Sequence, residues 1–117
     1  MTRHLIILND PPYGTERSYN GLRLANSLAK GEGVGVSVFL MGHAASCALA
    51  GQATPPGYYN IERMLKIFAS KGGEIGVCGS CMDARGIKPE SLVVGAHRSS
   101  MEELTAWTQE AGRVLVF

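Results

Sequence analysis

The sequence is poor in charge and contains no long hydrophobic run. Its 117 residues include 11 Lys and Arg against 10 Asp and Glu, which leaves a net charge of +1. The sequence contains no cluster of Lys and Arg that would form a basic patch, so it argues against a nucleic-acid binder. The first apolar run, residues 5–8, is followed at once by Asn9 and Asp10 and is too short for a signal peptide or a membrane span. We therefore expect a soluble, cytoplasmic protein with neither nucleic acid nor membrane as a partner.

Cysteine is also scarce. The three cysteines are an odd number, and without a secretion signal we expect them to be free thiols in a reducing compartment. With 45% apolar residues, the chain is suited to a single domain over residues 1–117. A domain of this length buries only about two-thirds of its unfolded-chain surface, so contact with further copies would add stability. We expect a homo-oligomer.

Apolar runs alternate with segments of helical periodicity. This order predicts an α/β fold with a parallel five-stranded sheet and helices on both faces. We expect strands at residues 5–8, 34–41, 74–77, 92–94 and 113–117. The continuous apolar run at 5–8 is typical of a strand covered on both faces.

Capping residues and glycines mark the expected helices. Thr15 or Ser18 is expected to cap the first helix, and Asn60 the helix that ends at Gly72-Gly73. Short helices are expected over 43–50 and up to Gly86, and a capping box of Ser99 and Glu102 predicts the last one. Residues 51–57 are the loosest stretch, either a lid or contact loop or an ordinary surface loop.

Polar side chains follow the ends of the expected strands. Asn9 and Asp10 follow the first strand, His43 follows the second, Cys78 and Cys81 follow the third, and His97 follows the fourth. Ligands bind at the carboxyl ends of parallel strands, so we expect Asn9, Asp10, Tyr13 and His43 to line a cleft shared with Cys78. Loops at these positions would need polar residues in any case.

The segment Cys78-Gly79-Ser80-Cys81 carries the most specific signal. Cys78 leaves a strand and precedes a short helix, whose N-terminus favours the thiolate form. Arg85 lies seven residues later and could reinforce that effect, while Gly79 allows close backbone approach by a partner or substrate. The alternative is that both cysteines are small, buried and inert.

A cysteine pair at this spacing has three chemical interpretations. A redox-active dithiol is typical of a thioredoxin-like strand order, which this sequence does not suggest. A zinc site needs two further ligands, which His43 and Cys47 could supply, but one pair falls short and we expect no metal. The third interpretation is a nucleophilic thiol that carries a persulfide, with Cys81 as its neighbour or resolving group.

The sequence resembles the YchN-like branch of the DsrE/DsrF family over nearly its whole length. The most specific match is residues 78–87, which include both cysteines and Arg85-Gly86. The other matching segments are residues 9–14, 20–25, 38–41, 57–64 and 114–117.

This resemblance implies a three-layer α/β/α fold, ring-like homo-oligomers (hexamers in YchN-like proteins, with a trimer as the other expectation) and a connection with sulfur relay. In members such as TusD, a cysteine after the third strand carries sulfur as a persulfide and stands eight residues before a glycine that follows arginine. Cys78 stands in the same relation to Arg85-Gly86. The resemblance thus implies a sulfur carrier or sulfurtransferase-like protein with Cys78 as acceptor.

Under this hypothesis, Cys81 and Arg85 assist, sulfur-donor and sulfur-acceptor proteins are partners, and no cofactor is needed. Two alternatives are a non-catalytic homo-oligomer that binds a small molecule or anion, and a metal-binding protein that uses the cysteine pair.

Overall fold

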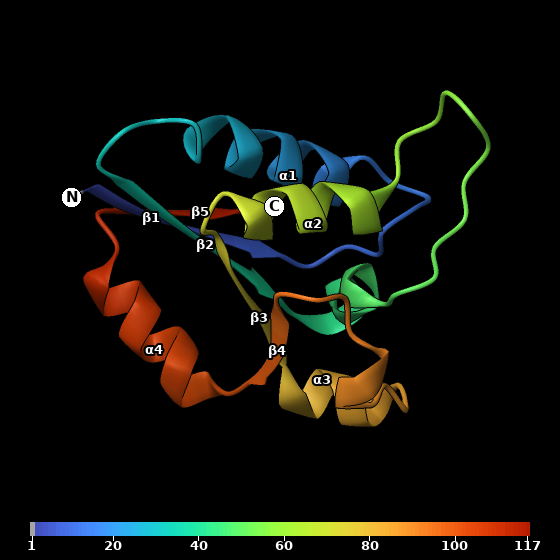
Figure 1. Ribbon diagram of the computed structural model, residues 1–117. Helices are drawn as coiled ribbons and strands as arrows, with labels where there is room; N and C mark the ends of the chain where they lie inside the picture. Colours follow the sequence, from blue (N-terminus) through green and yellow to red (C-terminus); the bar gives the residue numbers. More distant parts are fainter. Residues whose placement is uncertain (1) are drawn as a thin grey trace.

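All five strands lie in one parallel sheet with the order β4-β3-β2-β1-β5 (Figure 1). The computed structural model describes residues 2–117. The strands are β1 (Thr2–Leu8), β2 (Val34–Leu40), β3 (Glu74–Cys78), β4 (Ala96–Ser99) and β5 (Arg113–Val116). The predicted α/β fold with a parallel five-stranded sheet is therefore confirmed.

The first strand shows why its apolar run is continuous. Ile6 and Leu8 belong to the larger hydrophobic cluster, whereas Leu5 and Ile7 belong to a smaller cluster with Phe39. Side chains alternate between the two faces of a strand, so both faces of β1 are covered by apolar side chains.

Helices cover both faces of the sheet. The α-helices are α1 (Arg17–Leu28), α2 (Ile61–Ser70), α3 (Gly79–Ala84) and α4 (Met101–Glu110), and short 3-10 helices are η1 (Gly42–Ala48) and η2 (Pro89–Ser91). Figure 1 shows α1 beside α2 on one face, α4 on the other, and α3 beyond the end of β3. Within residues 2–117 no helix has the length and apolar character needed to span a membrane.

The fourth strand lies four residues later than predicted. Leu92 forms an antiparallel bridge with Leu49, and the Val93 N–H donates to the Ala48 carbonyl at 2.8 Å. Leu92 and Val93 therefore pair with the end of η1 and the residue after it, and not with the sheet. β4 is an edge strand with partly exposed side chains, so it carries no apolar pattern of its own.

Two of the expected helix starts are also corrected. The N-cap of α4 is Ser100, whose Oγ accepts from the Glu103 N–H at 3.3 Å, so the predicted box of Ser99 and Glu102 is one residue early. Residues 42–48 form a 3-10 helix in place of the helix expected over 43–50.

The expected N-caps of the other two long helices differ in outcome. Asn60 caps α2 as predicted, because its side chain accepts from the Arg63 N–H at 2.9 Å. α1 begins at Arg17 after Glu16, so neither Thr15 nor Ser18 is its N-cap. Ser18 instead donates to the Asp10 carbonyl at 2.7 Å, which fixes the loop after β1.

The loop at residues 51–57 is anchored at its beginning. The nearly buried carboxylate of Glu62 accepts from the Gly51 and Gln52 N–H groups at 3.0 and 2.8 Å. The Gln52 side chain also donates to the carbonyls of Cys47 and Leu49, both at 2.9 Å. Beyond this anchor, residues 55–58 are exposed and project from the body of the protein (Figure 1).

Candidate functional site

Cys78 is the last residue of β3 and the residue from which α3 starts. The two preceding residues of β3 show which face of the sheet Cys78 lies on. Val77 faces the cluster under α1 and α2, whereas a Cβ built on Gly76 would point toward Trp107 on the opposite face. The alternation puts Cys78 on the α4 face, where it packs against the cluster of Phe39, Leu104 and Trp107. The side chain is half-buried and remains accessible.

The surroundings of Cys78 favour its thiolate. Partial burial raises the pKa of Cys78, but hydrogen bonds from the Cys81 thiol, the Ser80 hydroxyl and the backbone N–H groups of both residues outweigh it. The pKa therefore lies below that of an ordinary thiol. Ser80 Oγ is 3.3 Å from Cys78 Sγ. A thiolate is the nucleophilic form of cysteine, so these contacts favour Cys78 over Cys81 as the nucleophile of the pair.

Cys81 is held in the opposite state. Burial and the hydrogen bond to Cys78 raise the pKa of Cys81, although the Gly42 N–H and the charge of Arg85 oppose the rise. The Gly42 N–H donates to Cys81 Sγ at 3.2 Å. Cys81 is therefore a neutral thiol that donates a hydrogen bond to Cys78.

Arg85 lies beside Cys81 and not beside Cys78. Its Nη1 donates to the Cys81 carbonyl at 3.1 Å, and its Nη2 is 3.4 Å from Nδ1 of His43. The structure thus joins the predicted residues Cys81, Arg85 and His43 in one group next to Cys78. The charge of Arg85 acts on the pKa of Cys81, whereas the sequence predicted that it would act on Cys78.

A pocket of about 260 Å³ opens at Cys78. It lies between α3, the end of β4 and the start of α4, and its lining residues are Cys78, Gly79, Ser80, Arg98, Ser99, Ser100 and Met101. Arg98 supplies the positive charge in this lining. Sequence reasoning missed Arg98 because it placed the fourth strand at residues 92–94; a strand at 96–99 would have brought Arg98 beside the end of β3.

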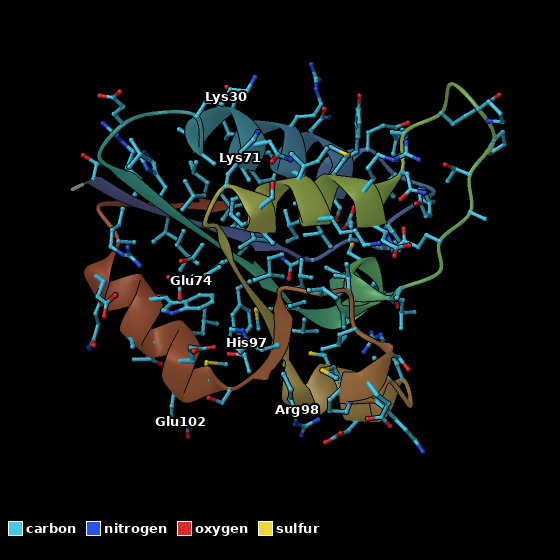
Figure 2. All side chains as sticks on the ribbon, viewed as in Figure 1. Lys30, Lys71, Glu74, His97, Arg98 and Glu102 are labelled. Carbon is cyan, nitrogen blue, oxygen red and sulfur yellow. The ribbon has the colours of Figure 1, made fainter. Side chains whose placement is uncertain are left out.

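Arg98 reaches from β4 over the start of α3. Its guanidinium donates to both carboxylate oxygens of Asp83, at 2.8 and 3.0 Å, and to the Gly79 carbonyl at 3.1 Å. Figure 2 shows Arg98 directed toward α3, while its neighbour His97 is directed toward α4. Arg98 therefore ties the strand that borders the pocket to the helix that follows Cys78.

Gly79 is required by this arrangement. A Cβ at this position would lie 2.9 Å from Arg98 Cζ and 2.9 Å from the Ser99 carbonyl oxygen. The sequence suggested that Gly79 leaves room for a partner or substrate, whereas the group that approaches its backbone in the structure is β4 of the same chain.

Ser99, which lines the pocket, belongs to a polar network between β4 and α4. Glu103 Oε1 accepts from the Ser99 hydroxyl at 2.6 Å and is in a short contact with His97 Nε2. Partial burial raises the pKa of Glu103, but these two hydrogen bonds outweigh it and lower the pKa overall. The network fixes the orientation of Ser99 at the pocket.

The other residues predicted to line the cleft hold loops in place. Asn9 Nδ2 donates to the Phe117 carbonyl at 3.2 Å, and the Asp10 carboxylate accepts from Thr15 at 2.8 Å. The Tyr13 hydroxyl donates to Gln52 at 2.5 Å. All follow the carboxyl end of β1. Within residues 2–117, no hydrogen bond or ion pair links Asn9, Asp10 or Tyr13 to the cysteine pair.

Cys47 is separate from the pair in environment and chemistry. It is fully buried, its Sγ lies 3.6 Å from the Asp10 carbonyl, and burial raises the pKa of its thiol to about 12. Across the described part of the chain, no three His, Cys, Asp or Glu side chains gather as metal ligands would.

A parallel α/β fold with a half-buried free cysteine at the end of its third strand places the protein in a defined class. The sequence pattern of the DsrE/DsrF-like family matches residues 3–117, and the chain belongs to this family. It is 37% identical to the protein YchN of Escherichia coli over the full length of both chains. An uncharacterised protein of Methanocaldococcus jannaschii is 37% identical over 96% of each chain.

Solved structures agree with this placement. The crystal structure of YchN from E. coli superposes with a TM-score of 0.93 over all of both chains, at 37% identity. A protein of unknown function from Methanobacterium thermoautotrophicum has a TM-score of 0.76 over all of both chains but only 13% identity, so it shows the fold alone. The predicted relationship to the YchN-like branch of the family is confirmed.

Proposed function

We propose that this protein carries sulfur as a persulfide on Cys78, as a sulfur carrier or sulfurtransferase-like protein. The observation that supports this most strongly is a half-buried thiol with a lowered pKa that opens onto a pocket. A deprotonated, accessible sulfur can react, and the pocket gives room for a second sulfur atom.

The transfer step conserves atoms and electrons. The Cys78 thiolate attacks the outer sulfur of a persulfide on the donor, and a new S–S bond forms to Cys78. The S–S bond of the donor breaks, and the donor cysteine leaves as a thiolate that takes a proton from water. The outer sulfur keeps its oxidation level, so no oxidant is needed.

Cys81 has a role in release. Its thiol lies within hydrogen-bonding contact of Cys78. Attack by Cys81 on the inner sulfur of the Cys78 persulfide anion forms a Cys78–Cys81 disulfide, and the outer sulfur leaves as HS⁻ with the proton lost by Cys81. A cellular thiol reductant then restores the pair.

The experiment is to incubate the protein with a cysteine desulfurase and cysteine, and to record the intact mass. Each sulfur accepted adds about 32 Da. Wild type should gain this mass, Cys78→Ser should not, and Cys81→Ser should gain it but release sulfide more slowly. Cys47→Ser is the matched control and should behave as wild type. Loading that survives in Cys78→Ser would contradict the proposal.

We further propose that the protein works as a homo-oligomer in the cytoplasm, a hexamer or a trimer, together with sulfur-donor and sulfur-acceptor proteins. Large apolar side chains that remain exposed support self-association: Tyr58, Ile67, Val94, Met101, Val114 and Val116. Light scattering at micromolar concentration should give the mass of such an oligomer, and a monomer would contradict it.

The second candidate is a non-catalytic homo-oligomer that binds a small molecule or anion. A separate polar pocket of about 230 Å³ favours it, lined by Gln52, Asn60, Glu62, Arg63 and Lys66. This candidate predicts that no sulfur is accepted in the desulfurase experiment and that Cys78→Ser leaves ligand binding unchanged.

A further inference from the structure

Arg98 brings a positive charge to the pocket in which Cys78 lies. Both residues line the same cavity. In the β3–β4 ladder Arg98 pairs with Val77, the residue before Cys78, and Cys78 pairs with Ser99, the residue after Arg98. The guanidinium is packed against the Cys78–Gly79 segment, since it donates to the Gly79 carbonyl at 3.1 Å. The charge of Cys78 contributes to the raised pKa of Arg98, after the hydrogen bond and the charge of Asp83.

The group that most needs a cation in this pocket is the outer sulfur of a persulfide. When Cys78 accepts a sulfur atom, the negative charge moves from Sγ to the added sulfur, which extends beyond the hydrogen bonds from Ser80 and Cys81. Charge-assisted hydrogen bonds are stronger than neutral ones, and a guanidinium offers several donors in one plane.

We propose that Arg98 is the anion-binding residue of this pocket and holds the outer sulfur of the Cys78 persulfide, with Asp83 as the partner of Arg98 while the pocket is empty. This inference rests on the proposed function and deepens it. It also names the donor class: persulfides and polysulfides whose transferable sulfur ends in a negative charge.

Arg85 is less suited to this role although it is nearer in sequence. Its guanidinium donates to the Cys81 carbonyl and lies beside His43, on the Cys81 side of the pair. It is not among the residues that line the pocket.

The ion pair with Asp83 determines how easily Arg98 can bind an anion in the pocket. Its side chain is 66% exposed and that of Arg98 is 43% exposed, so water competes with their ion pair. An incoming sulfur anion can therefore share or replace the carboxylate at modest cost. Removal of the Asp83 charge should leave Arg98 fully available to the persulfide.

The test uses sodium polysulfide as donor, which makes the Cys78 persulfide without a partner protein. The Cys78 thiolate takes one sulfur atom, and the polysulfide dianion leaves one sulfur shorter. The variants are Arg98→Gln, Arg98→Lys, Asp83→Asn and Arg85→Gln, with Arg3→Gln as the matched control. Arg3 forms an ion pair with Glu74 at 3.0 Å, at the amino ends of β1 and β3, away from the pocket.

We expect Arg98→Gln to lower the fraction of persulfide about two- to fivefold, the range typical of a partly exposed charge interaction. Arg98→Lys should recover part of that loss, Asp83→Asn should equal or exceed wild type, and Arg3→Gln should match wild type. Circular dichroism confirms that each variant is folded.

Three results would overturn the inference: equal loading in Arg98→Gln and wild type, a loss in Arg85→Gln in its place, or a loss in Asp83→Asn as large as in Arg98→Gln. The last result would show that the Arg98–Asp83 ion pair only keeps α3 in position and that Arg98 does not bind the persulfide. If wild type itself gains no sulfur, the proposed function fails and the inference fails with it; if wild type loads and the variants do not differ, only the inference fails.

Discussion

Substitution of Gly79 by alanine tests whether β4 packs directly on the start of α3. The new Cβ would lie 2.9 Å from the Ser99 carbonyl oxygen and 2.9 Å from Arg98 Cζ. The arginine side chain can move away, but the carbonyl belongs to the β3–β4 ladder and is fixed by it. The clash therefore forces β4 away from Cys78.

The size of the effect follows from two opposing contributions. Overpacking of this kind costs roughly 1–3 kcal/mol. Alanine in a helix gains up to about 1 kcal/mol over glycine. The net loss in the free energy of unfolding is about 1–2 kcal/mol, which lowers Tm by roughly 4–8 °C.

The assay is thermal unfolding followed by circular dichroism, with Gly112→Ala as control. The nearest atom to a Cβ at Gly112 is 3.6 Å away, an ordinary contact, so this variant should match wild type. Gly79→Ala should also change the rate at which iodoacetamide modifies Cys78, because residues of β4 border the pocket at that side chain. A Gly79→Ala protein with unchanged Tm and unchanged Cys78 reactivity would refute the described packing.

Three further predictions concern single residues. Iodoacetamide at neutral pH should modify Cys78 first and Cys81 more slowly, because the pKa is lowered in the former and raised in the latter, and it should spare buried Cys47, whose pKa is about 12. Trp107→Ala should cost about 3–5 kcal/mol in chemical denaturation, because the indole is buried against Phe39. Glu62→Gln should expose the loop after η1 to proteolysis and remove its acid-labile anchor. Since hydrogen bonding from Gln52 lowers the pKa of Glu62, that anchor stabilises the protein above the ordinary carboxyl pKa and weakens as pH falls through the folded value.

Each of these predictions has a control or a contrary result. Met101→Ala should change stability by less than about 0.5 kcal/mol, since Met101 is 60% exposed and lies in the same helix as Trp107. Equal iodoacetamide rates at Cys78 and Cys81 would show that the hydrogen bonds around Cys78 do not favour its thiolate. Unchanged proteolysis of Glu62→Gln would show that the carboxylate does not anchor the loop.

The buried parts of the fold were predictable, and one of the two edge strands of the sheet was not. The apolar runs of β1 and β2 and the Asn60 cap of α2 identify their elements because burial and capping leave a local pattern. The edge strand β5 keeps the apolar residues Val114, Leu115 and Val116 and could be predicted. β4 escaped prediction because its sequence Ala-His-Arg-Ser has no apolar run, while Leu92 and Val93 form such a run for another reason.

The same limit explains what was found and missed at the site. Local sequence places Cys78 between a strand and a helix, so its candidate role could be inferred. Arg98 belongs to β4 and lies 20 residues after Cys78 in the sequence. Its contact with Gly79 depends on the position of β4, which the sequence did not reveal. The placement of Arg85 beside His43 likewise depends on how η1 packs on α3, which no local pattern specifies.

The most direct test of sulfur transfer at Cys78 is to locate the accepted sulfur within the wild-type chain. After loading with a cysteine desulfurase and cysteine, the protein is alkylated, digested without reductant and mapped by mass spectrometry. The account predicts that the additional mass of about 32 Da lies on Cys78, with Cys81 and Cys47 alkylated or unmodified but without added sulfur. Added sulfur on Cys81 or Cys47 in place of Cys78 would contradict it, as would a chain that carries none.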